Sequence, residues 1–283
     1  MPASDLRPAS FADICARLRS AGCVFAEEEA QLLLSAASGP AQLASWVERR
    51  VAGYPLEHVL GWAQFCGLRI ELDAGVFVPR SRTELVVEEA VALLQAVALL
   101  QAKRPLEHRE RGSTAVVVDL CCGSGAVGAA IAARIPGIDL HAADVDPAAV
   151  DCARRNVSPA SGTVHLGDLF DALPAALKGK IQVVAVNAPY VPTGALNTMP
   201  QEARLHEKRT ALDGGPDGLD FHRRIAAGAP EWLLPGGSII IETSQGQAAQ
   251  TAEIMARAGL AVRIVRSDEL DGTVVVGTTR PPA

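Results

Sequence analysis

From residue 116 onward the chain alternates between short apolar runs and stretches with helical periodicity, and this alternation constrains the fold more than any other feature. Successive strands that are joined by helices run parallel, because each helix carries the chain back to the starting edge of the sheet. The pattern therefore predicts an α/β fold with a doubly wound parallel sheet, whose ligand lies beyond the carboxyl ends of the strands. The expected strands cover 116–119, a run ending near 144, 163–165, 181–186, 238–242, 260–265 and 273–278, and the expected helices cover 127–134, 147–156, 221–233 and 248–258.

In the first hundred residues the apolar positions are spaced differently. Apolar residues at helical spacing predict helices over 11–37 and 41–51, interrupted at Gly22 and at 38–40. Strand-like alternation over 55–79, with turn residues at 73–75, predicts a β-hairpin, and a helix follows from Thr83 to about Lys103. A polar loop is expected at 104–113. We therefore expect a helical domain at 1–54, a hairpin connector at 55–78 and a main domain at 79–283.

Charge and composition exclude several classes of protein. The chain has 26 Lys and Arg against 32 Asp and Glu, so a net charge of −6 gives no overall attraction for nucleic acid or an anionic membrane. The longest apolar run, 90–102, is shorter than the roughly 20 residues that cross a bilayer, so it predicts a buried helix. The first residues resemble no secretion signal, which predicts a cytoplasmic protein. Six cysteines without metal-ligand spacing predict neither a metal site nor disulfides.

The sequence VVVDLCCGSGAVG places an acid and a glycine-rich turn directly after a buried strand. Gly123, Gly125 and Gly128 fit a dinucleotide fingerprint, a cofactor loop of another kind, or a purely structural turn. Asp144 ends the next strand, where a carboxylate can accept hydrogen bonds from ribose hydroxyls. Asp119 suits the cationic sulfonium and amino group of S-adenosylmethionine better than a pyrophosphate. We therefore expect S-adenosylmethionine, held by Asp119, Cys121, Gly123, Gly125 and Asp144.

The segment GDLF follows the third strand of the main domain. Asp168 is expected to bind the adenine amino group, with Leu169 or Phe170 against the face of the ring. The alternative for Asp168 is a helix cap. Asp146 is better explained as the cap of the helix that begins at Pro147.

The sequence IQVVAVNAPYVP places Asn187, Ala188, Pro189 and Tyr190 after the fourth strand, within reach of a transferable methyl group. This pattern resembles the Asn-Pro-Pro-Tyr motif of amino methyltransferases, which act on planar nitrogens in glutamine or nucleobases. The lone pair of such a nitrogen is delocalised, so the nitrogen attacks well only where acceptors hold both of its N–H bonds. The side-chain oxygen of Asn187 and the carbonyl of Ala188 are the expected acceptors, and Tyr190 packs on the flat substrate group. Asn187 is expected to contact the cofactor as well. A simple turn is the alternative.

From about residue 55 the chain resembles the HemK-like, or release factor, glutamine methyltransferases. Matching positions lie in the hairpin and its exit, in a loop after the fourth strand, and near the fifth strand: Gly61, Phe65, Gly67, Pro79, Arg80, Thr83, Glu84, Glu202, Glu207, Ala211, Leu212, Gly215, Asp217, Gly218, Leu219, Glu242 and Gln247. Ala188 stands where this family commonly has Pro, Lys208 replaces a Pro, and Arg82 replaces an acid.

The resemblance implies a class I S-adenosylmethionine-dependent methyltransferase with a Rossmann-like, mostly parallel sheet of seven strands. It also implies that the small N-terminal helical domain at 1–54 serves substrate recognition and that 79–283 is the methyltransferase domain. Its substrate would be the glutamine of a Gly-Gly-Gln motif in a peptide-chain release factor, so the expected partner is a protein. Two alternatives remain: an amino methyltransferase of adenine or guanine in nucleic acid, and a non-catalytic S-adenosylmethionine-binding paralogue. The arginine pairs at 49–50, 154–155 and 223–224 lie on separate segments and predict no basic stripe.

Overall fold

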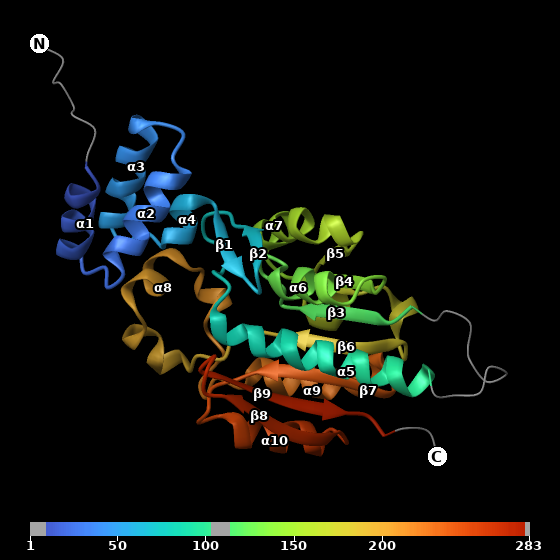
Figure 1. Cartoon of the computed structure of the whole chain (residues 1–283). Helices are drawn as coiled ribbons and strands as arrows, with labels where there is room; N and C mark the ends of the chain where they lie inside the picture. The colour runs from blue at the N-terminus through green and yellow to red at the C-terminus, as the bar shows by residue number, and fades with distance from the viewer. Residues whose placement is uncertain (1–9, 103–113, 281–283) are drawn as a thin grey trace, which may run out of the picture.

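The computed structural model describes residues 10–102 and 114–280, which form a helical unit, a hairpin and an α/β domain (Figure 1). The helices are α1 Phe11–Ser20, α2 Ala26–Ala36, α3 Pro40–Val51, α4 Leu56–Leu60, α5 Glu84–Ala102, α6 Ala126–Arg134, α7 Pro147–Val157, α8 Gln201–His206, α9 Asp220–Trp232 and α10 Ala248–Arg257. The strands are β1 Trp62–Phe65, β2 Leu68–Glu71, β3 Val116–Leu120, β4 Asp139–Asp144, β5 Thr163–Leu166, β6 Ile181–Val186, β7 Leu233–Glu242, β8 Ala261–Ser267 and β9 Gly272–Thr278. The expected loop at 104–113 and the expected end of α5 near Lys103 lie outside the described residues.

The main sheet of the described chain has seven strands in the order β5-β4-β3-β6-β7-β9-β8. The strands from β5 to β7 run parallel, and β9 pairs antiparallel with both β7 and β8. All six residues of β6 are buried, as expected of a central strand that helices cover on both faces. The predicted mostly parallel, seven-stranded α/β fold is confirmed.

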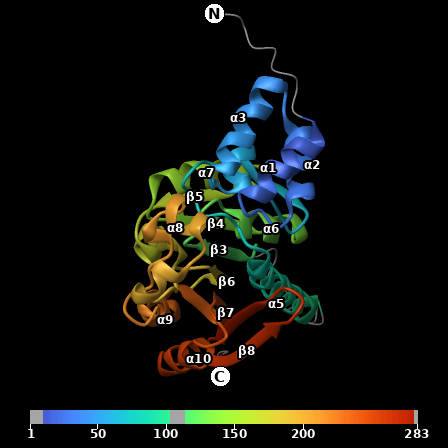
Figure 2. The same cartoon turned by 90° about the vertical axis from the view of Figure 1, so that its left-hand side faces the viewer.

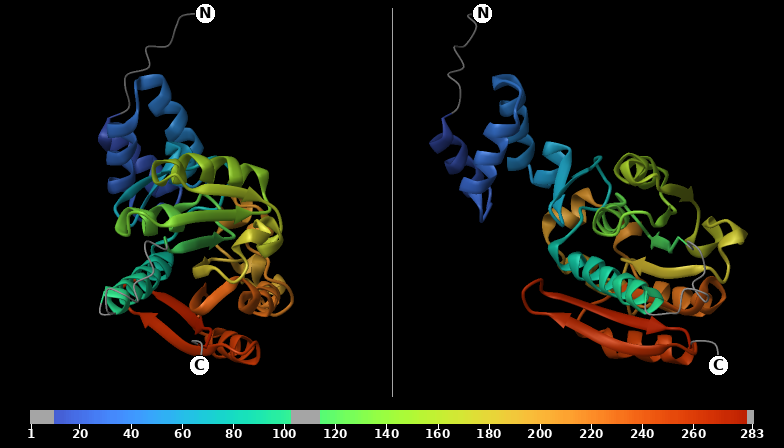
Figure 3. Two further views of the ribbon diagram at one scale, coloured as in Figure 1. Left: turned by 90° about the vertical axis from the view of Figure 1, so that its right-hand side faces the viewer. Right: turned by 45° about the vertical axis from the view of Figure 1, so that its right-hand side comes forward.

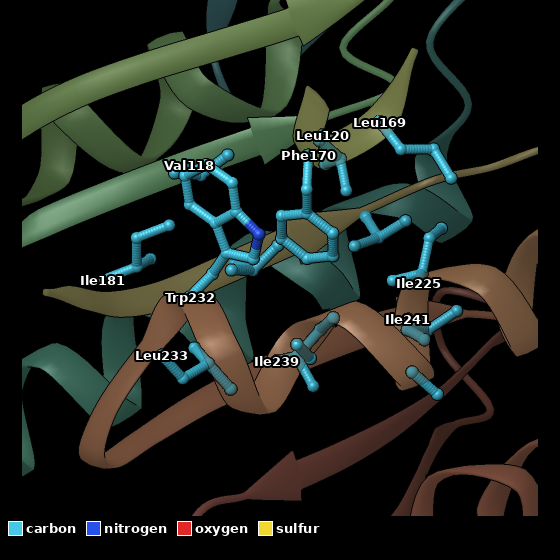
Figure 4. Close-up of a cluster of buried hydrophobic side chains, with 14 of the residues drawn as sticks. Val118, Leu120, Leu169, Phe170, Ile181, Ile225, Trp232, Leu233, Ile239 and Ile241 are labelled. Carbon is cyan, nitrogen blue, oxygen red and sulfur yellow. The ribbon is translucent and has the colours of Figure 1, made fainter. Parts of the chain in front are cut away.

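Helices α5 and α6 cover one face of the sheet, and α9 and α10 cover the other (Figures 1 and 3). On the second face Phe170 stacks on Trp232, with 5.7 Å between ring centroids and 14° between planes (Figure 4). Leu169 and Ala188 belong to the same apolar cluster. Full burial of an apolar side chain contributes about 1.5–3 kcal/mol, so this core holds the loops that carry these residues.

The N-terminal helices have a core of their own, which runs from Ile14 to Val59 (Figure 2). The first helix is capped by Ser10, whose hydroxyl accepts the Asp13 N–H while Asp13 reaches back to the Ser10 N–H. Because Val59 in α4 packs in this core, the helical unit continues to about residue 60, past the boundary expected at 54.

The hairpin forms, but its turn is not at the expected place. Strands β1 and β2 pair from Trp62↔Glu71 to Phe65↔Leu68, so the turn is Cys66-Gly67. Both turn residues have positive φ, 50° and 81°, as a two-residue turn of type I′ requires. A turn does form at 73–75, where the Val76 N–H donates to the Asp73 carbonyl at 3.2 Å, but it follows β2 and does not join the hairpin strands. The turn between the strands was missed because cysteine at the first left-handed position gives no turn signal in the sequence.

The prediction that 90–102 is a buried helix holds only for its first part. Ala90 and Leu94 are buried, whereas Leu99 and Leu100 are 63% and 65% exposed. The hexapeptide AVALLQ occurs twice in tandem, and six residues advance a helix by about 600°, so the second copy faces about 120° away from the first. The second pair of leucines therefore turns away from the sheet.

Candidate active site

A cavity of about 450 Å³ lies beyond the carboxyl ends of β3, β4, β6 and β7. Drug-sized ligands commonly occupy pockets of about 300–1,000 Å³. Ten of the eleven predicted site residues line the cavity, and Gly125 does not; the ten are Asp119, Cys121, Gly123, Asp144, Asp168, Leu169, Asn187, Ala188, Pro189 and Tyr190. The sequence predicted a ligand site at the carboxyl ends of the strands, and the structure has a cavity at this place.

Asp144 ends β4 and fixes the turn that follows β3. Its Oδ2 atom accepts the Gly123 N–H at 2.9 Å, and its Oδ1 atom accepts the Asp146 N–H at 2.9 Å. Burial raises the pKa of Asp144, against the lowering effect of these backbone donors. Each oxygen keeps a second lone pair, so the carboxylate is oriented by the backbone and can still accept from a ligand hydroxyl.

Asp119 lies deeper, 1% exposed near the end of β3. Its Oδ2 atom accepts the Gly128 N–H at 2.8 Å. Burial raises the pKa of Asp119 to about 8, although the Gly128 N–H lowers it. A buried carboxylate of this kind ionises readily only beside a cation.

Gly125 packs against α7 and does not border the cavity. Its φ is +75°, and a Cβ atom there would lie 3.0 Å from the Cβ of Ala153. The helix α6 begins directly after it. The structure therefore gives Gly125 a packing role in the turn.

The residues after β5 differ in whether their side chains border the cavity. Asp168 is half-exposed and pairs with Arg224 at 2.6 Å, and its side chain makes no cap hydrogen bond, so the alternative of a helix cap is not supported. Leu169 lines the cavity, whereas Phe170 packs in the core against Trp232. Of the two side chains expected near adenine, only Leu169 borders the cavity.

Asp146 caps α7 as expected, accepting the Ala148 N–H at 3.1 Å. The same carboxylate, which lines the cavity, also pairs with Lys208 at 2.6 Å. This second contact has no local signal in the sequence, because 62 residues separate the partners.

Asn187 follows β6, and its amide is oriented by the residue just before α5. Asn187 Nδ2 donates to Thr83 Oγ1 at 3.2 Å, and Thr83 is 2% exposed. The amide oxygen Oδ1 then faces away from this contact as an acceptor. Within residues 10–102 and 114–280, no donor is found on the Ala188 carbonyl oxygen. Two acceptors for one NH₂ group therefore lie on consecutive residues.

Tyr190 is anchored through its hydroxyl, which donates to Glu242 Oε1 at 3.0 Å. Burial is the main cause that raises the pKa of both groups. Gln247 Nε2 donates to the carbonyls of Tyr190 and Asp217, each at 3.0 Å. Gly218 completes this clamp, because a Cβ atom there would lie 2.3 Å from the Tyr190 carbonyl oxygen.

A wall of the cavity was missed by the sequence reasoning. Met199, Pro200, Glu202 and Ala203, in and just before α8, line it together with Glu207. This segment is polar and short, so it has no periodic signal that predicts a helix. Glu202 and Glu207 were identified only through the family resemblance.

Neither a metal cluster nor a membrane span emerges from the described residues. Across 10–102 and 114–280, no group of three or more His, Cys, Asp or Glu side chains is placed to hold a metal ion. No helix in the same ranges is long and apolar enough to cross a membrane.

Comparison with known proteins identifies the family. Residues 97–269 match the methyltransferase small domain family. The chain is 33% identical over 267 residues to the release factor glutamine methyltransferase of Bradyrhizobium diazoefficiens, covering 88% of this chain and 86% of the relative. This chain belongs to the release factor glutamine methyltransferase family.

Two further relatives show the breadth of the similarity. A 4-amino-L-phenylalanine/4-methylamino-L-phenylalanine methyltransferase of Streptomyces pristinaespiralis is 34% identical over 225 residues, covering 78% of this chain and 73% of the relative. A methyltransferase structure from Pyrococcus furiosus has a TM-score of 0.51 at 14% identity, covering 84% of this chain and 99% of that chain, and shows the fold alone.

As a member of this methyltransferase family, the protein is a class I methyltransferase that uses S-adenosylmethionine. The residues present fit that cofactor. The buried Asp119 carboxyl, with its raised pKa, suits a cationic group, and Asp144 stands at the end of β4, where ribose hydroxyls need acceptors.

Proposed function

We propose that this protein methylates the side-chain amide nitrogen of a glutamine, in the Gly-Gly-Gln motif of a peptide-chain release factor. One observation carries the proposal: Thr83 fixes the Asn187 amide so that its oxygen, together with the Ala188 carbonyl, offers two acceptors beside the cofactor cavity. A primary amide has two N–H bonds, and this pair of acceptors matches them.

S-adenosylmethionine supplies a methyl group on a sulfonium, ready for in-line displacement. Asn187 and Ala188 hold the two N–H bonds of the substrate amide and direct its lone pair towards the methyl carbon. Their contribution is orientation, and well-oriented groups contribute on the order of 7–11 kcal/mol to such reactions. The new C–N bond would form as the S–CH₃ bond of the sulfonium breaks, so that a neutral thioether leaves, and the amide nitrogen would lose one proton to solvent.

Tyr190 and Pro189 form the flat side of the substrate subsite. The hydrogen bond from Tyr190 to Glu242 and the Gln247 clamp on the Tyr190 carbonyl hold the ring at a fixed angle. We propose that this ring packs on the planar amide. On the cofactor side, Asp119, Cys121, Gly123, Asp144, Asp168 and Leu169 would hold S-adenosylmethionine, next to Asn187.

A protein substrate is favoured over nucleic acid by the way the arginine pairs are used. Arg154 and Arg155 bind carboxylates, and so do Arg223 and Arg224. These cations are neutralised on the protein and form no free basic stripe. The helical unit up to about residue 60 would contribute to recognition of the release factor. Peptide-chain termination places the enzyme in the cytoplasm.

The test is a comparison of substrate classes with labelled S-adenosylmethionine. A release factor, an adenine- and guanine-containing oligonucleotide and 4-amino-L-phenylalanine are incubated in parallel with the protein. We expect label on the release factor and none above background on the oligonucleotide. Label on the oligonucleotide or on the amino acid, with none on the release factor, would refute the proposal. Absence of label on all three substrates would favour a non-catalytic paralogue.

A further inference from the structure

Arg50 in α3 is a buried cation held by carboxylates from two distant parts of the chain. Its guanidinium donates to both oxygens of Glu29 in α2, at 2.6 and 3.0 Å, and to Glu202 in α8 at 2.7 Å. It also donates to the Tyr54 carbonyl at 3.1 Å. The Arg50 side chain is 7% exposed, and 152 residues separate it from Glu202.

These contacts of Arg50 fix the position of α8 relative to α3. Burial alone would lower the pKa of Arg50, but the hydrogen bonds and charges of Glu29 and Glu202 raise it, so the guanidinium stays charged. The planar guanidinium presents its donors in a fixed fork, unlike a lysine ammonium. Loss of one partner leaves a buried charge uncompensated. The three side chains therefore hold α8 at one position against α3.

The element held in this way is a wall of the methyl-transfer cavity. Met199, Pro200, Glu202 and Ala203 border the same space as Asn187. Helix α8 has six residues and buries only Ala203, and a helix of fewer than two turns has little stability of its own. Its position therefore depends on its anchors.

The other anchors divide between the helical unit and the main domain (Figures 1 and 2). The ring of Tyr54, next to α3, lies 4.1 Å from that of His206 at the end of α8. After α8, Glu207 pairs with Arg80, and Lys208 pairs with Asp146. The N-terminal side of α8 is thus held by Arg50, whereas residues 207–208 are held by the α/β domain.

We propose that Arg50 is a positioning residue for methyl transfer, through which the helical unit completes the substrate wall at α8. This inference deepens the proposed function and rests on it wherever activity is the readout. It predicts that a change in the helical unit raises KM even for a small amide substrate that is too short to touch α1–α3.

The test uses the full-length protein and a short peptide that contains Gly-Gly-Gln. Arg50→Ala and Glu202→Ala are expected to raise KM for this peptide at least tenfold while the Kd for S-adenosylmethionine stays within threefold. Arg50→Lys should fall between the parent and Arg50→Ala. The KM of the double variant Arg50→Ala/Glu202→Ala should be no more than twofold above that of the more severe single variant. Arg17→Ala is the matched control, because its exposed pair with Glu48 lies within the helical unit and should leave KM at the parental value.

Glu202→Ala keeps the test decisive if Arg50→Ala does not fold, because the Glu29–Arg50 pair remains and Glu202 is 42% exposed. Hydrogen exchange over 200–207 provides a second readout that needs no substrate. Faster exchange there in Glu202→Ala, with unchanged exchange in the parallel strands, is expected. Parental KM together with parental exchange would overturn the inference. A parent that labels no glutamine would refute the proposed function, and exchange then decides whether Arg50 holds α8.

Discussion

Replacement of Asp119 by Asn tests how the cavity accommodates a cationic cofactor. In the free protein, burial raises the pKa of Asp119 to about 8. A bound cation favours the ionised carboxylate, so binding below pH 8 must release the Asp119 proton. Affinity therefore rises as the pH rises towards 8 and levels off above it.

The size of this effect follows from the pKa. With a free-protein pKa of about 8 and full ionisation in the complex, the apparent Kd should fall by about fiftyfold between pH 6 and pH 8. Asp119→Asn keeps an oxygen for the Gly128 N–H but carries no titrating proton. The cofactor's own α-amino group titrates near pH 8 as well, and the variant reports that contribution alone.

Calorimetry between pH 6 and pH 8.5, in buffers of different ionisation enthalpy, measures both the affinity and the protons released. We expect proton release on binding at pH 6.5 by the parent, in excess of that by Asp119→Asn. Equal pH dependence in the two proteins would refute the role of Asp119 as the counter-charge of the cofactor. Because a raised carboxyl pKa costs stability as the pH rises from about 4 to about 8, Asp119→Asn should also raise the Tm of the free protein at pH 7.

Three further predictions concern the same cavity. Asn187→Ala should lower the single-turnover rate at least about a hundredfold, since loss of one positioned polar contact in a transition state commonly costs about 2.7–4 kcal/mol, and calorimetry should find cofactor affinity nearly unchanged. Asp144→Ala should weaken S-adenosylmethionine binding by about 1.5–3 kcal/mol in calorimetry, and an affinity within twofold of the parent would remove its assignment to the ribose. Glu242→Gln should keep most of the kcat, because its side-chain oxygen still accepts the Tyr190 hydroxyl. Glu242→Ala should lower kcat as Tyr190→Phe does. A parental kcat in Glu242→Ala would exclude the role of Glu242 as the anchor of Tyr190.

The sequence was most informative where a local pattern determines the structure. Strand and helix periods located the main-domain elements, and the ends of β3, β4 and β6 placed Asp119, Asp144 and Asn187 around one cavity. Parallel strands bring their carboxyl ends to one edge, so residues far apart in sequence could be grouped from local patterns.

Contacts between distant segments could not be predicted in this way. The Thr83 contact that orients Asn187 spans 104 residues, and the Arg50 contact with Glu202 spans 152. Neither contact has a local signature. The turn at Cys66-Gly67 was missed for a different reason, because a cysteine with φ of 50° depends on its tertiary surroundings.

The most direct test of the account is to locate the transferred methyl group. A release factor is incubated with the protein and S-adenosylmethionine that carries a deuterated methyl group, and its peptides are sequenced by tandem mass spectrometry, with Asn187→Ala in parallel. We predict a single deuterated methyl group on the side-chain amide of the Gly-Gly-Gln glutamine, formed by the parent and nearly absent with Asn187→Ala. A methyl group on another residue, or equal labelling by Asn187→Ala, would contradict the account.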